Sequence, residues 1–510
     1  MVQAADKIKH VFVLMLENRS FDHLLGQSGI AGINVPSNTD ANLDPRTNQY
    51  ISAGPFPSGP VYQLDNSYRD PSHEFIDALE QLTRLTKYPP NSAYPANKID
   101  NSGFVIDYHD NAKSQKEDTV MYGFTAEQLP ILNSLARQFA VCDCWFSALP
   151  GPTVPNRLFV HAGTSGGLDD SPSPFTLALQ IGIQGIKFAN GNIYDRIDAK
   201  AGTPNAPVWH IYKGGATALV EQVGDVKKHP DRIHALSEMK GLLAGYTDSP
   251  TYNFIEPKYD LLGNYKNGNS QHPYGDVRAG EALIKEVFET IQASAIWKNS
   301  LLIITYDEHG GFYDHVAPPP AVPPGDTVAP GIKSKNHFLF DNYGIRVPAL
   351  FISPFTNPGM VVKSKPGAQF DHTSIIKTLC ELWGLDPLTN RDRSARSILP
   401  ELLDVQRTSS IEPLTEVILP DGLLEAINQP ETSASDSAEA YAGENTQADL
   451  DGMIYTHLQL TMMNNLQGLS PEDATAKVEE LGNSITTKAQ ALDYMNGVSN
   501  VPLNNETGAA

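Results

Sequence analysis

Three short runs of apolar residues alternate with helical patterns along the first 400 residues. The runs are His10–Leu16, Ser300–Tyr306 and 347–353, and each ends abruptly in polar residues. Continuous apolar runs of this length are typical of strands that are buried on both faces of a parallel sheet. Apolar residues at helical spacing predict helices over 129–139, 276–297 and 374–385. This alternation predicts an α/β fold, with a central, mostly parallel sheet and helices on both faces.

The chain divides by charge near residue 400. Residues 401–510 carry 18 acidic and 3 basic residues, whereas residues 1–400 carry 41 acidic and 34 basic residues. We therefore expect a globular domain over 1–405, a linker over 406–450 and an acidic, helical C-terminal extension over 451–510. Whether the extension packs on the body, closes over a cleft or forms a homo-oligomer stays open.

The composition excludes several classes of protein. The net charge of −22 argues against a sequence-independent grip on nucleic acid or on an anionic membrane. No apolar stretch is long enough to span a bilayer, so we expect peripheral membrane contact at most. The N-terminus lacks a signal-peptide pattern, which leaves a cytoplasmic location and secretion with the leader already removed both open. Three cysteines are too few for a disulfide framework, and the spacing of Cys142 and Cys144 is poor for a bridge.

Polar residues follow the first two predicted strands. Glu17 and Asn18 follow the first, and Asp307, Glu308 and His309 follow the second. The carboxyl ends of parallel strands meet at one edge of a sheet, which is where α/β proteins bind ligands. Grouped carboxylates would repel one another there unless a cation compensated them. The pattern predicts one divalent metal ion, with Ca, Zn, Mg and Fe all open, although a solvated loop remains an alternative.

A rigid turn at 151–157 supplies a candidate nucleophile. Prolines lie on both sides of Thr153, and the following residues can begin a helix. A hydroxyl at a helix N-terminus beside a metal is suited to attack phosphorus, and Arg157 is suited to clamp a phosphoryl oxygen. A rigid turn with a capping threonine is an equally natural interpretation.

Histidines are the expected proton donors. A site that protonates a departing alkoxide near neutral pH needs an imidazole. Of the 14 histidines, we single out His272, which precedes a predicted helix, and with less support His73 and His210. A structural role for any one of them stays open.

These residues lie in segments that resemble a known family. The segment LENRSFDH at 16–23 resembles the opening motif of the bacterial, fungal and plant phospholipase C and acid phosphatase family, a branch of the alkaline phosphatase superfamily. The resemblance continues through PGPTVPNR at 150–157, TYDEHGGFYDH at 305–315 and DHTS at 371–374, in the family's order. It implies an alkaline-phosphatase-like sandwich and makes residues 1–405 the catalytic domain.

The resemblance also implies roles for individual residues. Metal ligands would be Glu17, Asn18, Thr153, Asp307 and Glu308; catalytic residues would be Thr153, His272, His210 and His73; and substrate contacts would come from Arg157 and His309. Thr153 would attack phosphorus to give a phosphothreonine intermediate, and a histidine would protonate the departing alcohol. Water would then release the phosphorylated product.

Three functions compete. The leading hypothesis is a phospholipase C that cuts the glycerol-side phosphoester of phosphatidylcholine-like lipids, and the alternative is an acid phosphatase acting on phosphomonoesters. A catalytically silent scaffold that binds a metal or a partner is the third. Aromatic residues in the loops either hold a choline cation or pack together. They are Tyr88, Tyr94, Phe104, Tyr108, Tyr122 and Phe124.

Overall fold

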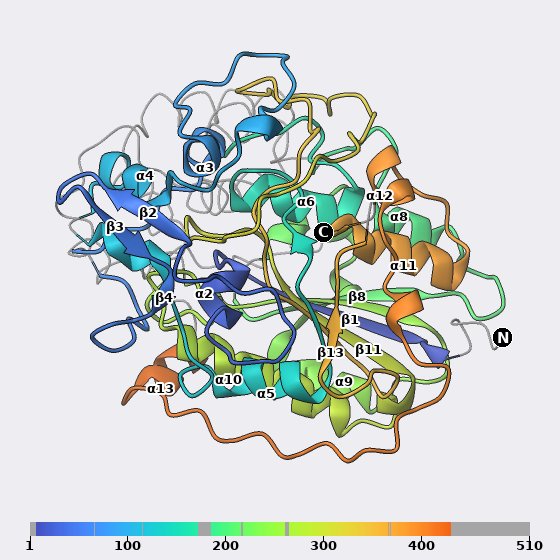
Figure 1. Ribbon diagram of the computed structural model, residues 1–510. Coiled ribbons are helices and arrows are strands. Elements are labelled where there is room, and N and C mark those ends of the chain that lie inside the picture. Colours follow the sequence, from blue (N-terminus) through green and yellow to red (C-terminus); the bar gives the residue numbers. More distant parts are fainter. Residues whose placement is uncertain are drawn as a thin grey trace, which may run out of the picture.

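The computed structural model describes residues 7–429, apart from 66, 115, 172–184, 216–217, 261–264, 366 and 368 (Figure 1). An eight-stranded sheet with the order β13-β6-β12-β11-β1-β10-β8-β9 forms its centre. Strand β1 (His10–Leu16) runs parallel to β11 (Ser300–Tyr306) on one side and to β10 (Thr251–Glu256) on the other. The predicted α/β class and the mostly parallel sheet are confirmed.

The third predicted strand differs in its direction. Strand β12 (Ala349–Ile352) lies antiparallel to both β11 and β6 (Ala140–Cys142). Parallel neighbours need a crossover, which is usually a helix. The fully described segment 307–348 between β11 and β12 contains no helix, so β12 returns in the opposite direction. The remaining strands of the sheet are β8 (Val208–Lys213), β9 (Ile233–Ala235) and β13 (Met360–Val362).

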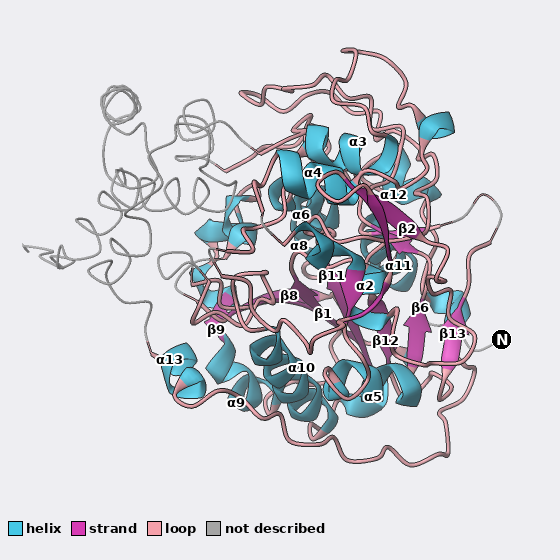
Figure 2. Cartoon of the chain, turned by 60° about the vertical axis from the view of Figure 1, so that its left-hand side comes forward, coloured by secondary structure: helices cyan, strands magenta, loops and turns pink. Residues whose placement is uncertain are grey.

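Helices cover both faces of the sheet (Figures 1 and 2). One face carries α5 (Pro130–Gln138), α9 (Met239–Leu243) and α10 (Val277–Gln292). The other carries α6 (Thr153–Ala162), α8 (Ile193–Asp198) and α11 (Thr373–Trp383). Helices α5, α10 and α11 confirm the three predicted from helical spacing.

Shorter elements complete the fold. The further helices are α2 (Phe21–Leu25), α3 (Phe75–Thr83), α4 (Phe104–Asp110), α12 (Asn390–Ser394) and α13 (Leu423–Asn428). The two-stranded pairs are β2 (Ala41–Asp44) with β3 (Gln49–Ser52), β4 (Gly54–Pro55) with β5 (Tyr122–Gly123), and β7 (Trp145–Phe146) with β14 (Phe370–Asp371). In the view of Figure 1, α3, α4, β2 and β3 gather on the side toward which β1 points.

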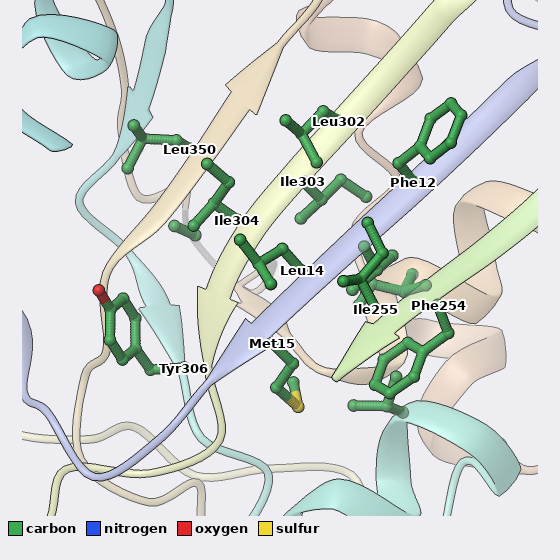
Figure 3. Packing of buried hydrophobic residues seen from close by; sticks show 14 of the residues in the cluster. Phe12, Leu14, Met15, Phe254, Ile255, Leu302, Ile303, Ile304, Tyr306 and Leu350 are labelled. Carbon is green, nitrogen blue, oxygen red and sulfur yellow. The ribbon is translucent and has the colours of Figure 1, made fainter. Parts of the chain in front are cut away.

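The central strands are held by a dry core. Phe12, Leu14, Ile255, Leu302 and Ile304 are fully buried, and their side chains lie side by side on one face of the sheet (Figure 3). Burying one side chain of this size contributes about 1.5–3 kcal/mol. The core therefore makes the strand ends a fixed platform for the residues that follow them.

The segment after the body keeps contact with it. Within the predicted linker, Arg407 N–H donates to the Pro354 carbonyl at 2.8 Å, and Glu416 pairs with Lys285 at 2.9 Å. The end of α13 accepts hydrogen bonds from Lys258 Nζ, including one of 2.9 Å to the Ile427 carbonyl. The rest of the predicted linker and the whole 451–510 extension lie outside the described residues, so its self-association stays a prediction. Among the helices of the described segments, none has the length and apolarity that a membrane span requires.

Candidate active site

The sheet register brings the two polar strand ends together. Leu16 of β1 is paired in parallel with Tyr306 of β11, so the residues that follow them lie side by side. Asn18 N–H donates to Asp307 Oδ1 at 3.0 Å. Glu17, Asn18, Asp307 and Glu308 are all buried. Four of the predicted metal ligands therefore meet at one edge of the sheet.

No described residue donates a hydrogen bond to two of the carboxylate oxygens at this edge. Glu17 Oε1 accepts from Ser270 Oγ at 2.9 Å and Glu308 Oε2 from Gly310 N–H at 2.7 Å, but Glu17 Oε2 and Glu308 Oε1 are buried without such a donor. Arg157 Nη2 lies 3.9 Å from Glu17 Oε2, too far for a hydrogen bond. A buried carboxylate oxygen without a donor is costly. Burial, and then the neighbouring Asp307, raise the pKa of Glu17 well above its usual range. The donor set therefore fits a divalent cation, which would satisfy both oxygens.

Helix α6 places Thr153 beside these ligands. Pro152 is its N-cap, with φ −78° and ψ 178°, and Thr153 is its first residue. The side chain of Asn156 fixes the turn, because its Nδ2 donates to the Gly151 carbonyl at 2.9 Å. Thr153 Oγ1 donates to Asn18 Oδ1 at 3.3 Å. The hydroxyl thus lies at the positive end of a helix, next to the strand-end carboxylates.

Arg157 lies one turn further along α6 and binds the protein. Its Nε donates to Asp307 Oδ2 at 2.8 Å, and its Nη2 donates to the Leu16 carbonyl at 3.0 Å. The guanidinium also lies over the ring of Tyr259, 5.4 Å from its centroid. These contacts fix the end of β1 and compensate Asp307, and Arg157 Nη2 also lies 3.9 Å from Glu17 Oε2. Its Nη1 is buried and has no hydrogen-bond partner among the described residues, so the phosphoryl clamp stays a prediction.

His73 is the predicted histidine that contacts this group. Its Nε2 lies 3.3 Å from Asn18 Nδ2, and its Nδ1 donates to the Pro71 carbonyl at 2.8 Å. Because Nδ1 is turned toward the Pro71 carbonyl, Nε2 is the ring nitrogen that faces Asn18 at the strand ends. Burial lowers the pKa of His73, but the Glu308 and Asp70 carboxylates together outweigh it and raise the pKa to about 10.

His272 lies further out. Its Nε2 is 3.4 Å from Asp70 Oδ2, its Nδ1 accepts the Tyr274 N–H at 3.3 Å, and its ring stacks on Tyr265. The His272 backbone N–H donates to Ser270 Oγ at 3.3 Å, which links it to Glu17 through one residue.

The structure does not bring His210 to the site. His210 is paired with Asn253, which is paired with Phe12, four residues before the end of β1. Its Nδ1 lies 3.1 Å from Nε2 of His234 on the edge strand β9. This placement corrects the prediction, which rested on residue type and carried no information on position along the strand.

His309 contacts two protein groups. Its Nε2 lies 2.6 Å from Gln81 Oε1, and its Nδ1 is 3.2 Å from Glu308 Oε2. These contacts position Glu308, and the expected contact of His309 with substrate stays a prediction. His372, which lies in the DHTS motif, positions the site similarly, because its Nε2 donates to the Asp307 carbonyl at 2.6 Å.

The sequence did not single out Ser270 and Gln81. Neither belongs to a local pattern, and each contacts a strand end only because a distant segment of the chain folds against it.

The aromatic residues of the loops pack together. Tyr88, Tyr94, Phe104 and Tyr108 are buried in one apolar cluster with Phe75, so they do not form an open cage for choline.

A second acidic group lies nearby. Ligand atoms of Asp22, Asp314 and His315 lie within 4.8 Å of one another. However, the guanidinium of Arg346 donates to Asp22 Oδ1 at 2.7 Å and to Asp314 Oδ1 at 3.1 Å. An arginine already compensates these carboxylates, so the strand-end group fits a metal ion better.

Comparison with known proteins identifies the class. Residues 8–386 match the model of the Phosphoesterase family. Non-specific phospholipase C3 of Arabidopsis thaliana is 34% identical over 404 residues, covering 78% of this chain and 73% of the relative. Phospholipase C B of Mycobacterium tuberculosis is 27% identical over 427 residues, covering 75% and 74%. The chain belongs to the phosphoesterase family, and it is a phosphoric ester hydrolase.

Similarity to solved structures is low, as one example shows. A protein in the alkaline phosphatase superfamily from Vibrio parahaemolyticus is 13% identical and gives a TM-score of 0.31, covering 52% of this chain and 63% of that one. A score this low supports no argument, and the fold class follows from the sheet itself.

Proposed function

We propose that the chain is a phospholipase C that hydrolyses the glycerol-side phosphoester of phosphatidylcholine-like lipids. The products are diacylglycerol and a phosphorylated head group. One observation carries the proposal: the Thr153 hydroxyl at the start of α6 donates to Asn18 at the strand ends, where Glu17 and Glu308 each keep an oxygen that accepts no hydrogen bond from the described residues. The names of the relatives support a phosphodiester lipid as the substrate.

A divalent cation belongs at the strand ends in this proposal. Glu17, Asn18 and Glu308 would hold it, together with Asp307 and the Thr153 hydroxyl. When bound, such an ion supplies positive charge for the developing negative charge on the phosphoryl oxygens and favours the threonine alkoxide.

The covalent steps use Thr153 and His73. Thr153 Oγ gives its proton to solvent and forms a bond to phosphorus while the bond from phosphorus to the glycerol oxygen breaks. His73 Nε2 gives its proton to the departing oxygen, and the N-terminal N–H groups of α6 stabilise the charge that develops on the phosphoryl oxygens. Water then attacks phosphorus and gives one proton to His73, its remaining O–H staying on the released phosphorylated head group, while Thr153 Oγ takes a proton from solvent as the phosphothreonine bond breaks.

The remaining residues orient these groups. Arg157 fixes Asp307, His309 fixes Glu308, and Ser270 fixes Glu17 through the hydrogen bonds described above. His272 acts one layer further out, through Asp70 and Ser270. The alternative function, an acid phosphatase acting on phosphomonoesters, would use the same groups.

A paired assay tests the proposal. Hydrolysis of p-nitrophenylphosphorylcholine and of p-nitrophenyl phosphate is measured for wild type, Thr153→Ala and Thr83→Ala. Thr83 is a matched control, because it is also a buried threonine on a helix, but its hydroxyl contacts local backbone groups: it donates to the Leu79 carbonyl and accepts from the Leu85 N–H. Removing the nucleophile is expected to lower diester cleavage about 10³-fold or more, with Thr83→Ala close to wild type.

Each result of that assay has one meaning. Strong monoester cleavage without diester cleavage would favour the acid phosphatase. Activity that survives in Thr153→Ala would exclude Thr153 as the nucleophile. Loss of activity in His210→Gln but not in His73→Gln would reverse the histidine roles proposed above. No wild-type activity with Ca, Zn, Mg and Fe each supplied would leave only the silent scaffold.

A further inference from the structure

Two of the three cysteines lie in direct contact. Cys142 ends β6 and Cys144 follows two residues later, so both side chains point to the same side of the extended chain. Their Sγ atoms are 3.7 Å apart, and both thiols are free and buried. The spacing in the sequence argued against a bridge, but the fold has already brought the two sulfurs to van der Waals contact.

Cys144 is also reached from a cavity. A cavity of about 500 Å³ lies beside it, lined by apolar residues such as Ile33 and Phe146 and by polar ones such as Asn34 and Lys363. Cys142 is not among the lining residues. Of the two cysteines, a small reagent that enters the cavity would therefore meet Cys144 first.

A guanidinium lies against the same sulfur. Arg396 Nη1 donates to Cys144 Sγ at 3.9 Å, and Arg396 is itself held by Glu401 at 2.5 Å and by the Lys363 carbonyl at 2.7 Å. Burial raises the pKa of the Cys142 thiol well above its usual range, and Cys142 does not line the cavity. Cys144, which lines the cavity, is thus placed to attack and Cys142 to resolve.

We propose that Cys142 and Cys144 form a redox-active dithiol that takes a low-molecular-weight disulfide through this cavity and closes to an intrachain disulfide. The Cys144 thiolate attacks one sulfur of the small disulfide, which releases one thiol and leaves a mixed disulfide on Cys144. The Cys142 thiolate then attacks Cys144 Sγ and releases the second thiol. Two electrons pass from the protein dithiol to the small disulfide, and a small thiol reductant reverses both steps.

The pair is connected to the strand ends. Trp145 directly follows Cys144, and its indole Nε1 donates to His372 Nδ1 at 3.2 Å. His372 in turn donates to the Asp307 carbonyl at 2.6 Å. Bridging the sulfurs means closing 3.7 Å to about 2.0 Å, which pulls on the chain next to Trp145. Oxidation is therefore expected to lower hydrolysis about tenfold or more, since misplacement of about 1 Å can cost 10²-fold; this consequence rests on the proposed site.

Thiol counting tests the dithiol itself. The reduced full-length chain is incubated natively with oxidised glutathione, quenched with acid, and its free thiols are counted after denaturation. Wild type is expected to fall from three free thiols to one, with a linked Cys142–Cys144 peptide in the mass spectrum. Cys142→Ser is expected to stop at a single glutathione adduct on Cys144, and Cys144→Ser to remain unmodified over the same time.

Cys380→Ser is the matched control. Cys380 is buried and its thiol donates to the Asp386 carbonyl at 3.8 Å, away from the Cys142–Cys144 contact, so this variant is expected to form the bridge as wild type does. Three free thiols in native wild type after long incubation, or equal modification of Cys144→Ser and wild type, would overturn the proposal. These readouts do not depend on the enzyme's activity, so they stand or fall separately from the proposed function.

Hydrolysis measured before oxidation, after it and after dithiothreitol tests the connection to the strand ends. The account expects a rate that falls and recovers in wild type and in Cys380→Ser, but stays constant in the double variant Cys142→Ser/Cys144→Ser. An unchanged rate in fully bridged wild type would overturn the connection through Trp145.

Discussion

Arg346 is expected to be one of the most important single residues for stability. It is fully buried, and its guanidinium donates to Asp22 Oδ1 at 2.7 Å and to Asp314 Oδ1 at 3.1 Å. It also donates to the carbonyls of Asn34 and Asp143, each at 3.1 Å. These contacts tie α2, the segment after β11 and the approach to β12 to one cation.

Replacing Arg346 with methionine keeps much of the volume but removes the charge. Removing one partner of a buried ion pair costs about 3–5 kcal/mol, because a buried charge is left uncompensated. We expect the lower part of that range, about 3–4 kcal/mol, because Asp22 Oδ2 keeps the His315 Nδ1 contact at 2.7 Å and Asp314 Oδ1 keeps the Val316 N–H at 2.9 Å.

Urea unfolding followed by tryptophan fluorescence measures this loss. The unfolding buffer contains a chelator, because a stray cation could otherwise replace the guanidinium among the ligand atoms of Asp22, Asp314 and His315. The set is wild type, Arg346→Met, Asp314→Asn and the double variant, with the exposed Arg84→Met as control. Because Asp314→Asn removes one stranded charge, the double variant should lose less than the sum of the singles, by about 1 kcal/mol or more.

Two results would refute this reasoning. One is a loss below about 1 kcal/mol in Arg346→Met, which would place it with ordinary surface substitutions. The other is strict additivity in the double variant, which would mean that the two charges do not interact.

Three further predictions follow from other sites. Burial raises the pKa of Glu281 from 4.5 to about 7. The protonated carboxyl therefore stabilises the folded state fully below pH 4.5, and this contribution is lost as the pH rises through 7. Between these pH values, the free energy of unfolding should fall more steeply for wild type than for Glu281→Gln. Gly310 has φ +62°, and an added Cβ would lie 2.2 Å from the Asn18 carbonyl oxygen, so Gly310→Ala should lower the rate of hydrolysis about 10²-fold. The control Gly384→Ala, also at positive φ but with open space around it, should leave the rate unchanged. Equal rates in the two variants would contradict this prediction. Ser270→Ala removes the donor to Glu17 and should weaken metal binding about 10- to 100-fold in a calorimetric titration, so an affinity equal to that of wild type would show that this hydrogen bond does not orient the ligand.

Three strands of the central sheet, β1, β11 and β12, could be predicted because burial on both faces leaves a local pattern. Strands β1 and β11 have the bounds of their apolar runs, 10–16 and 300–306. The direction of β12 could not be predicted in the same way, since direction depends on the connection and not on the composition of the strand. A buried strand shows the same run of apolar residues whether it lies parallel or antiparallel to its neighbours.

For the candidate site, too, only the residues that belong to a local sequence pattern could be predicted. Glu17, Asn18, Asp307 and Glu308 could be predicted as a group, because parallel neighbours must end at the same edge. Their partners could not, since Ser270 and Gln81 meet the strand ends only through tertiary contacts. His210 shows the converse error: its residue type suits catalysis, but its position within β8 places it away from the strand ends.

Metal binding by variants of the two acidic groups shows which group holds the ion. Chain freed of metal is titrated calorimetrically with each divalent ion, for wild type, Glu308→Gln and Asp314→Asn. We expect one site in wild type, an affinity at least about 100-fold weaker in Glu308→Gln, and an unchanged affinity in Asp314→Asn. Wild-type affinity in Glu308→Gln, with the loss confined to Asp314→Asn, would exclude the strand ends and move the ion to the group beside Arg346.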